Sequence, residues 1–332
     1  MDARKIQETG GSSYIITLPK RWVEDNHIKK KQPVGLTINS DGSLTITPTI
    51  TDDVFEKTLR LDADQFRQQA FLFRMLVSAY FMGYTRIQIC SKTKLTPAQR
   101  DAITDFIQTA IGPEVMRETD RELTIKDLLK PDEMPIENTV SRLQILVSSM
   151  HEEAVKSYLN GKTKLAWEVV NQDKEIDRLY WLVARQYHMV LRQNVLAKNM
   201  KSTLHEAAFY FEVSRKMERM GDHAVKIAKQ TSRFKPKKEL RDEIMIASRQ
   251  ALEMFENSIK SWFKKDLEKA NHVIDSKKQL LVDCDNLTAK SLKLRQPRTT
   301  AAIYVTESIK RTGLYSANIS ESVLDYLIHN VT

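Results

Sequence analysis

A seven-residue segment that recurs 92 positions later constrains this chain of 332 residues more than any other feature. The first copy reads Glu218-Arg219-Met220-Gly221-Asp222-His223-Ala224, and the second reads Lys310-Arg311-Thr312-Gly313-Leu314-Tyr315-Ser316. Two upstream segments, which begin at Val169 and Val273, extend the similarity. A duplication at a period of about a hundred residues predicts two homologous units packed about a pseudo-twofold axis.

Both units are expected to be helical. From Ile136 onward, glycine and proline are few, and good helix formers carry apolar residues at helical spacing. The pattern predicts helices over 136–160, 162–196 and 203–232 in the first unit, and over 239–264, 266–294 and 298–328 in the second. Thr203 and Glu206 form a capping box, and Pro297 suits the start of the last helix.

Four carboxylates gather in the first unit. Glu218 and Asp222 are four residues apart and therefore share one helix face, and Asp173 and Asp177 form a second such pair. Because apolar stripes flank them, these acids should be partly removed from water, where they need a cation or another polar partner. Oxygen ligands suit Mg, Mn, Ca or Fe, so the pattern predicts a divalent or iron-type metal ion in the first unit.

The second unit lacks all four acids. The corresponding positions hold Lys277, Leu281, Lys310 and Leu314. A second metal site is therefore predicted to be absent. For the first unit another interpretation stays open, in which the acids form interhelical ion pairs with Arg178, Arg215 and Arg219. His223 could be a further ligand or a purely structural residue.

These repeats resemble the PhoU family of phosphate-uptake regulators, through Asp-x-x-x-Asp on the second helix and Glu-Arg-Met-Gly-Asp-His-Ala on the third. The resemblance covers roughly residues 136 to 330. In that family the motif carboxylates are implicated in binding metal clusters. The ligands implied for this chain are Asp173, Asp177, Glu218 and Asp222. The resemblance also implies a phosphate transporter or a sensor kinase at the membrane as candidate partners.

The first fifty residues have a different character, with four of the nine glycines of the chain and short alternating segments. We expect strands at 4–7 and 14–17 around a turn at 10–13, a short helix that opens at Pro19, and a hairpin over 35–48 that turns at Asp41-Gly42. This pattern predicts a small β domain that is separate from the helical repeats.

The segment from Arg4 to Lys20, which ends in Thr-Leu-Pro-Lys, resembles the swapped-hairpin DNA-binding domains of the AbrB, MazE and SpoVT group. Such a domain is too small to bury a core alone, and the resemblance implies a homodimer that exchanges hairpins. Lys31 replaces the glycine usual in that group. Cationic side chains would contact DNA phosphates or bases, and the candidates are Arg4, Lys5, Lys20 and Arg21. The alternative is a dimerisation module without DNA affinity.

Residues 54–130 are expected to form a small α+β subdomain without recognisable chemistry. Strands are predicted at 55–61 and 86–90, around a helix whose apolar face carries Phe66, Ala70, Phe73, Val77 and Tyr80. A second helix should follow the capping box that begins at Thr96, and 113–126 should form an edge strand or hairpin.

Composition bounds the remaining possibilities. The net charge of +9 and the pI near 9.3 favour an anionic partner, but the cluster Lys235, Lys237, Lys238 and Arg241 is as readily a solvated linker as a binding patch. The two cysteines lie far apart, and we find neither a signal segment nor an apolar run long enough to span a membrane. We therefore expect a cytoplasmic protein. No nucleophile with its base, Walker loop or zinc motif indicates an enzyme.

The sequence thus predicts a mainly α protein with domains at 1–50, 54–130, 136–234 and 237–330. The two three-helix repeats would follow a small swapped-hairpin β domain and the α+β subdomain. The predicted function is regulation of phosphate uptake by a dimeric, DNA-binding transcriptional regulator with a metal-binding body. The alternative is an adaptor that inhibits a phosphate transporter or sensor kinase by contact, with the first domain serving only dimerisation.

Overall fold

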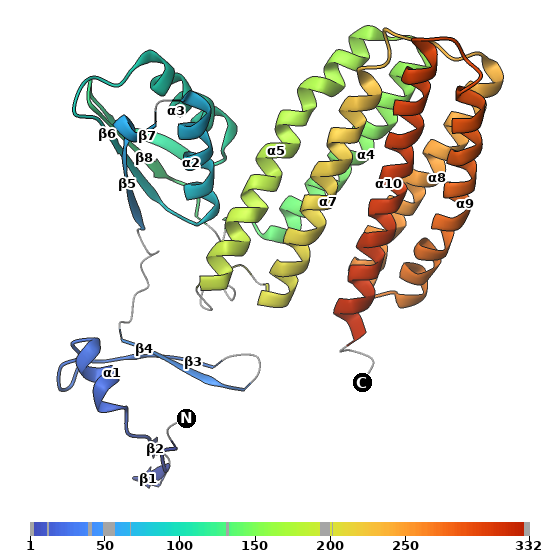
Figure 1. Ribbon diagram of the computed structural model, residues 1–332. Coiled ribbons are helices and arrows are strands. Elements are labelled where there is room, and N and C mark those ends of the chain that lie inside the picture. The colour runs from blue at the N-terminus through green and yellow to red at the C-terminus, as the bar shows by residue number, and fades with distance from the viewer. Residues whose placement is uncertain are drawn as a thin grey trace. The chain divides into compact units, whose positions relative to one another are not determined.

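The computed structural model describes residues 3–11, 13–38, 42–48, 57–66, 68–130, 133–192, 200 and 202–328. The chain divides into two compact units, Met1–Glu56 and Lys57–Thr332 (Figure 1). Within the described residues, no helix is both long enough and apolar enough to cross a membrane.

The first unit consists of two hairpins and a short helix. Strands β1 (Gln7–Thr9) and β2 (Ser13–Ile15) pair antiparallel, as do β3 (Gly35–Ile38) and β4 (Leu44–Thr47), and α1 (Lys20–Asp25) lies between them in the chain. The predicted hairpin over 35–48 is confirmed. The first strand begins three residues later than expected, and Ser12 and Asp41 of the two expected turns lie outside the described residues.

None of the described residues in this unit is buried. Large apolar side chains are exposed on it, among them Tyr14 at 74% and Ile38 at 69%. Lys31 adopts a φ of 67°, a left-handed conformation that favours glycine, which explains why a glycine suits this position. A single copy of this unit therefore has no hydrophobic core of its own.

The second unit begins with a four-stranded sheet that two helices cover. Strands β5 (Thr58–Asp62), β6 (Arg86–Cys90), β8 (Glu122–Asp127) and β7 (Pro113–Glu118) follow one another across the sheet. The pair β5 and β6 is parallel and the others are antiparallel. The first pairing needs a crossover, which α2 (Gln69–Phe81) provides. Residues 55 and 56 of the expected first strand lie outside the described residues.

The buried face of α2 differs from the expected one. Leu72, Leu76, Ala79 and Tyr80 are buried, whereas Ala70 is exposed and Phe66 precedes the helix. Tyr80 is buried as predicted, and Phe73 and Val77 are partly buried against the same core, so the prediction was wrong only for Ala70 and for placing Phe66 on the helix. Helix α2 is apolar on two sides. One side covers the sheet, and on the other Phe73 packs against Trp181 of the helical body, with 6.0 Å between ring centroids.

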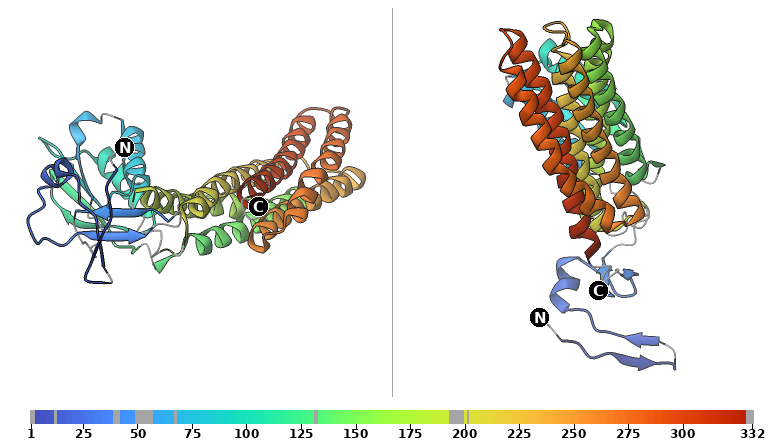
Figure 2. Two further views of the ribbon diagram at one scale, coloured as in Figure 1. Left: turned by 90° about the horizontal axis from the view of Figure 1, so that it is seen from below. Right: turned by 90° about the vertical axis from the view of Figure 1, so that its right-hand side faces the viewer.

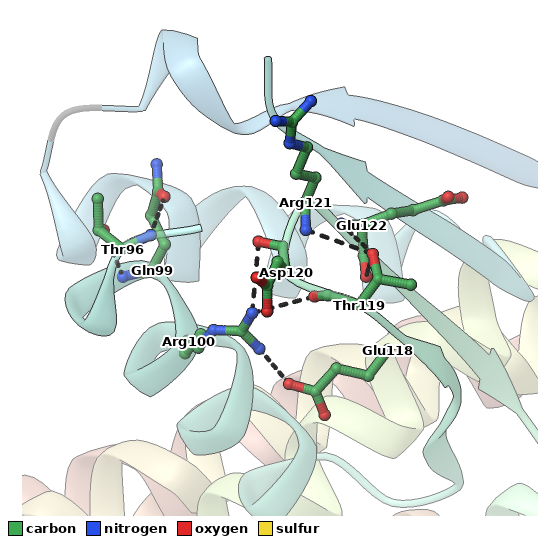
Figure 3. A network of polar contacts seen from close by, with 8 residues as sticks. All are labelled: Thr96, Gln99, Arg100, Glu118, Thr119, Asp120, Arg121 and Glu122. Atoms are coloured by element: carbon green, nitrogen blue, oxygen red, sulfur yellow. Dashed lines mark hydrogen bonds and ion pairs between the residues drawn. The ribbon is translucent and has the colours of Figure 1, made fainter. Parts of the chain in front are cut away.

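Helix α3 (Pro97–Thr109) begins with the expected capping box, in which Thr96 and Gln99 each accept a backbone hydrogen bond from the other. One turn later, the Arg100 guanidinium pairs with Glu118 and donates to the carbonyl oxygen of Thr119 at 3.0 Å (Figure 3). The Thr119 hydroxyl in turn accepts from the backbone N–H of Glu122. This network ties α3 to the turn between β7 and β8.

The helical body contains two triplets. The first comprises α4 (Ile136–Asn160), α5 (Thr163–Arg192) and α7 (Leu204–Ala228). The second comprises α8 (Lys238–Lys264), α9 (Leu267–Ser291) and α10 (Arg298–Leu327). These bounds confirm the expected helices, although residues 193–196 lie outside the described ones and α7 ends four residues early. Gly161, with a φ of 69°, ends α4.

The triplets meet through equivalent helices, as the duplication predicts. Helix α7 packs against α10, and α4 packs against α8, while α5 and α9 lie at the two outer edges of the helical body (Figures 1 and 2). His151 Nε2 of α4 lies 3.0 Å from the Ser248 hydroxyl of α8, and the Arg241 guanidinium donates a hydrogen bond to Asn160 Oδ1 at 2.9 Å. The residue that comes later in α4 thus contacts the residue that comes earlier in α8, so these two helices run antiparallel. Antiparallel contact between equivalent helices is the arrangement of a pseudo-twofold axis.

A buried ion pair joins the sheet to the helical body. Arg185 of α5 lies 2.6 Å from Asp127 at the end of β8, and the side chains are only 3% and 5% exposed. The Arg185 guanidinium also donates to the carbonyl oxygens of Tyr80 and Tyr84 and lies over the Tyr80 ring. Burial raises the pKa of Asp127, and the adjacent guanidinium opposes that rise.

We expect Arg185→Met to reduce the free energy of unfolding by about 3–5 kcal/mol, because it leaves Asp127 buried without its partner. The more exposed pair of Arg142 and Glu175, with side chains 59% and 30% exposed, supplies the control, and Arg142→Ala should cost no more than about 1 kcal/mol because Glu175 keeps Arg178 as a partner. Urea unfolding followed by circular dichroism measures both changes. Equal losses in the two variants would contradict the structural role of the buried pair.

Candidate functional site

A close approach of α5 and α7 builds the candidate site. A Cβ atom added to Gly221 of α7 would lie 2.6 Å from Ile176 Cδ1 and 3.6 Å from Asp173 Oδ1 of α5. Because glycine has no Cβ, the two helices can approach each other closely at Gly221. Glu218 and Asp222 flank Gly221, so the approach brings their helix face toward that of Asp173 and Asp177.

The four carboxylates influence one another electrostatically. Burial raises the pKa of Asp177 to about 7, and the charges of Asp173, Glu218 and Asp222 add to the rise. Burial and Asp222 likewise raise the pKa of Asp173, and the same two causes raise that of Glu218. The structure thus brings all four predicted site residues close enough together that their charges contribute to the raised pKa values of Asp173, Asp177 and Glu218.

Cations compensate this cluster only in part. Arg219 lies 3.7 Å from Glu218, whereas Arg178 pairs with Glu175 instead. Among the described residues, Asp173, Asp177 and Asp222 have no lysine or arginine within 4.0 Å. The interhelical ion pairs considered from the sequence are therefore not formed by these three acids in the described part of the chain.

The donor set fits an oxygen-preferring cation in its chemistry, since it offers four partly buried carboxylates that repel one another. As the side chains stand, no group of three or more His, Cys, Asp or Glu within the described residues is close enough together to hold a metal ion. Binding would consequently require rotation of the carboxylate side chains toward a common point.

His223 lies apart from this cluster. Its Nδ1 is 3.2 Å from the Ser308 hydroxyl of α10, and its ring is tilted against that of Tyr315. Burial and nearby cations lower the pKa of His223 to about 4, so the ring is neutral at physiological pH. The residue therefore belongs to the contact between the two triplets.

The second triplet repeats the shape of the site with inverted charge. Gly313 approaches Leu280, just as Gly221 approaches Ile176. Lys277, at the position of Asp173, lies 3.6 Å from Glu321. Glu321 corresponds to Lys229 of the first triplet, and the charge of Lys229 lowers the pKa of Asp173. The acid and the base of this contact are therefore exchanged between the two triplets.

The sequence reasoning missed Lys229, although a signal was present. Lys229 follows Asp222 by seven residues, which places both on the same side of α7. Gly221, which belongs to the repeated segment 218–224, carries a second signal. A glycine inside a helix that is otherwise made of good helix formers can mark a close contact, and here the contact is with Ile176.

Comparison with known proteins agrees with this architecture. The family model of the PhoU domain matches residues 140–231 and 244–323, which correspond to the two triplets. The chain belongs to the PhoU family. The model of the antidote-toxin recognition MazE family, a bacterial antitoxin, matches residues 7–52. This PhoU protein therefore carries a MazE-like unit ahead of its helical body, and no curated protein sequence matches it significantly.

Two solved structures share the fold of the PhoU body. PhoU from Pseudomonas aeruginosa has a TM-score of 0.53 and 18% identity, and the match covers 60% of this chain and 98% of that protein. The phosphate transport system regulatory protein PhoU from Streptococcus pneumoniae has a TM-score of 0.51 and 19% identity, with coverage of 59% and 94%.

The predicted DNA-contacting residues of the first unit are exposed on two segments. Lys20 and Arg21 begin α1, where they lie 3.6 Å from Glu24 and Asp25 respectively, with side chains 89% and 92% exposed. Arg4 and Lys5 precede β1 and are also exposed. Such exposed pairs contribute little to stability, so Lys20 and Arg21 can exchange their carboxylates for phosphate groups at low cost.

The raised pKa of Asp177 predicts a pH dependence of stability in the metal-free protein. Between the ordinary value of 3.8 and about 7, the folded chain holds this proton more tightly than the unfolded chain does. The free energy of unfolding should therefore fall as the pH rises through that window. Asp177→Asn should make the fall smaller when chelator-treated protein is unfolded by urea at about pH 5 and about pH 8.

The exposed carboxyl of Asp101 on α3 provides the control for this measurement. Asp101→Asn should leave the pH dependence unchanged. If Asp177→Asn behaves in the same way, the Asp177 carboxyl is not destabilised by its neighbours, and the description of the cluster is wrong.

Proposed function

We propose that this protein regulates phosphate homeostasis as a cytoplasmic, non-enzymatic regulator. The match of the PhoU family model to both triplets carries this proposal. The name of the Streptococcus pneumoniae protein, a phosphate transport system regulatory protein, indicates the same process. A phosphate transporter or a sensor kinase would then be the natural partner of the helical body at the membrane.

The helical body would respond through a metal ion between α5 and α7. Asp173, Asp177, Glu218 and Asp222 would rotate toward a divalent or iron-type cation, which would neutralise the repulsion that raises the pKa of Asp177. Because the second triplet has Lys277 and Lys310 at two of the equivalent positions, each chain would hold one metal site only.

The first unit would form a homodimer. Its described residues include no buried side chain, and its large apolar residues are exposed. A second copy of the same unit would cover these apolar side chains, and such pairing supplies the core that so short a segment cannot build alone.

DNA is the proposed ligand of this dimer. Arg4, Lys5, Lys20 and Arg21 are exposed cations, and a dimer would present each of them twice to the phosphate backbone. Metal binding or a protein partner would bias the conformational equilibrium of the dimer and thereby its affinity for DNA. The second candidate function is an adaptor, in which the first unit only dimerises and the body acts by contact with a transporter or kinase.

Binding of the full chain to promoter DNA of phosphate-transport genes distinguishes these functions. We expect specific binding that weakens steeply with salt, and a lower salt slope in Arg4→Ala and Arg21→Ala, because each loses a phosphate contact. Lys264→Ala, which removes a cation from the end of α8, is the control and should bind like the wild type. Fluorescence anisotropy at several salt concentrations measures the slopes.

If the affinity for promoter DNA is no higher than for random DNA, the transcriptional role is wrong. The first unit is then a dimerisation module, and the adaptor function takes its place.

A further inference from the structure

A basic cleft lies at one end of the helical body, away from the carboxylate cluster. At this end α7 and α9 finish and α8 and α10 begin (Figure 1). The cleft has a volume of about 740 Å³ and is formed by the connection between α7 and α8 together with the turn between α9 and α10. Its size lies within the range of small-molecule sites in proteins, about 300–1,000 Å³.

The lining of the cleft is strongly cationic. It contains one carboxylate, that of Glu239, and six cations, which are Arg233, Lys235, Lys237, Lys290, Lys293 and Arg298. Lys290 pairs with Glu243 and lies 3.8 Å from Glu239. In the part of the chain that the structure describes, Arg233, Lys235, Lys237 and Lys293 form no ion pair with a carboxylate. The cleft therefore holds an excess of positive charge.

Two helix N-termini also favour an anionic ligand in the cleft. Helices α8 and α10 both begin at the cleft, after Lys237 and Pro297, and neither N-cap residue accepts a hydrogen bond through its side chain. The first N–H groups of a helix favour a negative charge, so cations at these positions are electrostatically unfavourable. By contrast, α7 and α9 begin at the other end of the body, with Thr203 and Asp266 as side-chain caps.

We propose that this cleft binds a ligand that carries two or more phosphate groups. Arginine and lysine side chains bind phosphate oxygens, and uncapped helix N-termini supply further N–H donors for an anion. The six cations come from two separate stretches of the chain, 233–237 and 290–298, so a single phosphate group would contact only some of them. An oligophosphate can reach cations of both stretches and neutralise more of their charge.

Part of the lining of the cleft is apolar. Phe234, Leu240 and Leu294 contribute to it, and the Arg298 guanidinium lies 6.0 Å from the centre of the Phe234 ring. These apolar side chains allow an organic group to be attached to the phosphates. The cleft shares no residue with the carboxylate cluster, so its occupancy can be tested independently of the metal proposal and of DNA binding.

The test is calorimetric titration of the full-length, metal-free chain with tripolyphosphate, so that chelation of a bound metal cannot be mistaken for binding. Orthophosphate and ATP are titrated in parallel. We expect one tripolyphosphate per chain, bound at least about tenfold more tightly than orthophosphate. The double variant Arg233→Ala/Lys293→Ala, which changes only exposed side chains, should weaken this binding at least about tenfold.

The control is Lys264→Ala/Lys278→Ala, which removes the same charge from exposed positions on α8 and α9 outside the cleft. It should bind tripolyphosphate like the wild type. Binding of ATP as tight as that of tripolyphosphate also supports the proposal and places an organic group in the cleft. Absence of saturable binding, or an equal loss in both double variants, would overturn it.

A lipid surface is the competing source of phosphate groups. Vesicles that contain phosphatidylinositol bisphosphate distinguish the two sources in a sedimentation assay. If the chain binds these vesicles but not soluble tripolyphosphate, the soluble ligand is wrong and the basic end of the body contacts a membrane instead.

Discussion

The contact between Gly221 and Ile176 determines where every acid of the candidate site lies. It brings α7 against α5 at the level of Asp173, and the helical spacing of the other three carboxylates then places them around the same contact. Gly313 and Leu280 reproduce the contact in the second triplet. The duplicated geometry is therefore maintained by apolar packing, which leaves the charged positions free to differ between the two copies.

The charged positions do differ between the two triplets of the helical body. In the second triplet Lys277 faces Glu321, and Lys310 lies 3.0 Å from Asp285, so the equivalent positions are compensated within the chain. In the first triplet Asp173, Asp177 and Asp222 have no cation within 4.0 Å among the described residues. Burial and the neighbouring carboxylates therefore make the charged form of Asp177 unfavourable and raise its pKa. A bound metal ion is the simplest way to remove this repulsion between the carboxylates.

The sequence predicted the helices and the two carboxylate pairs because both depend on local periodicity. Spacing alone placed Asp173 with Asp177 and Glu218 with Asp222, and the repeat related the two triplets. Features that depend on tertiary contact were missed. The face of α2 was misassigned in part, at Ala70, because the helix packs against both the sheet and Trp181. The cluster at Lys235 could not be distinguished from a solvated linker, because Lys290 and Lys293, which line the same cleft, lie more than fifty residues further along the chain, at the end of α9 and just after it.

In the proposed function, only the first triplet holds a metal ion. Anomalous diffraction from crystals of the full chain soaked in Mn²⁺ can locate such an ion. We expect an anomalous peak between α5 and α7, among the four carboxylates, and none beside Lys277 and Lys310. If the first peak is absent, or if both triplets show peaks of equal height, the first triplet is not a selective metal site.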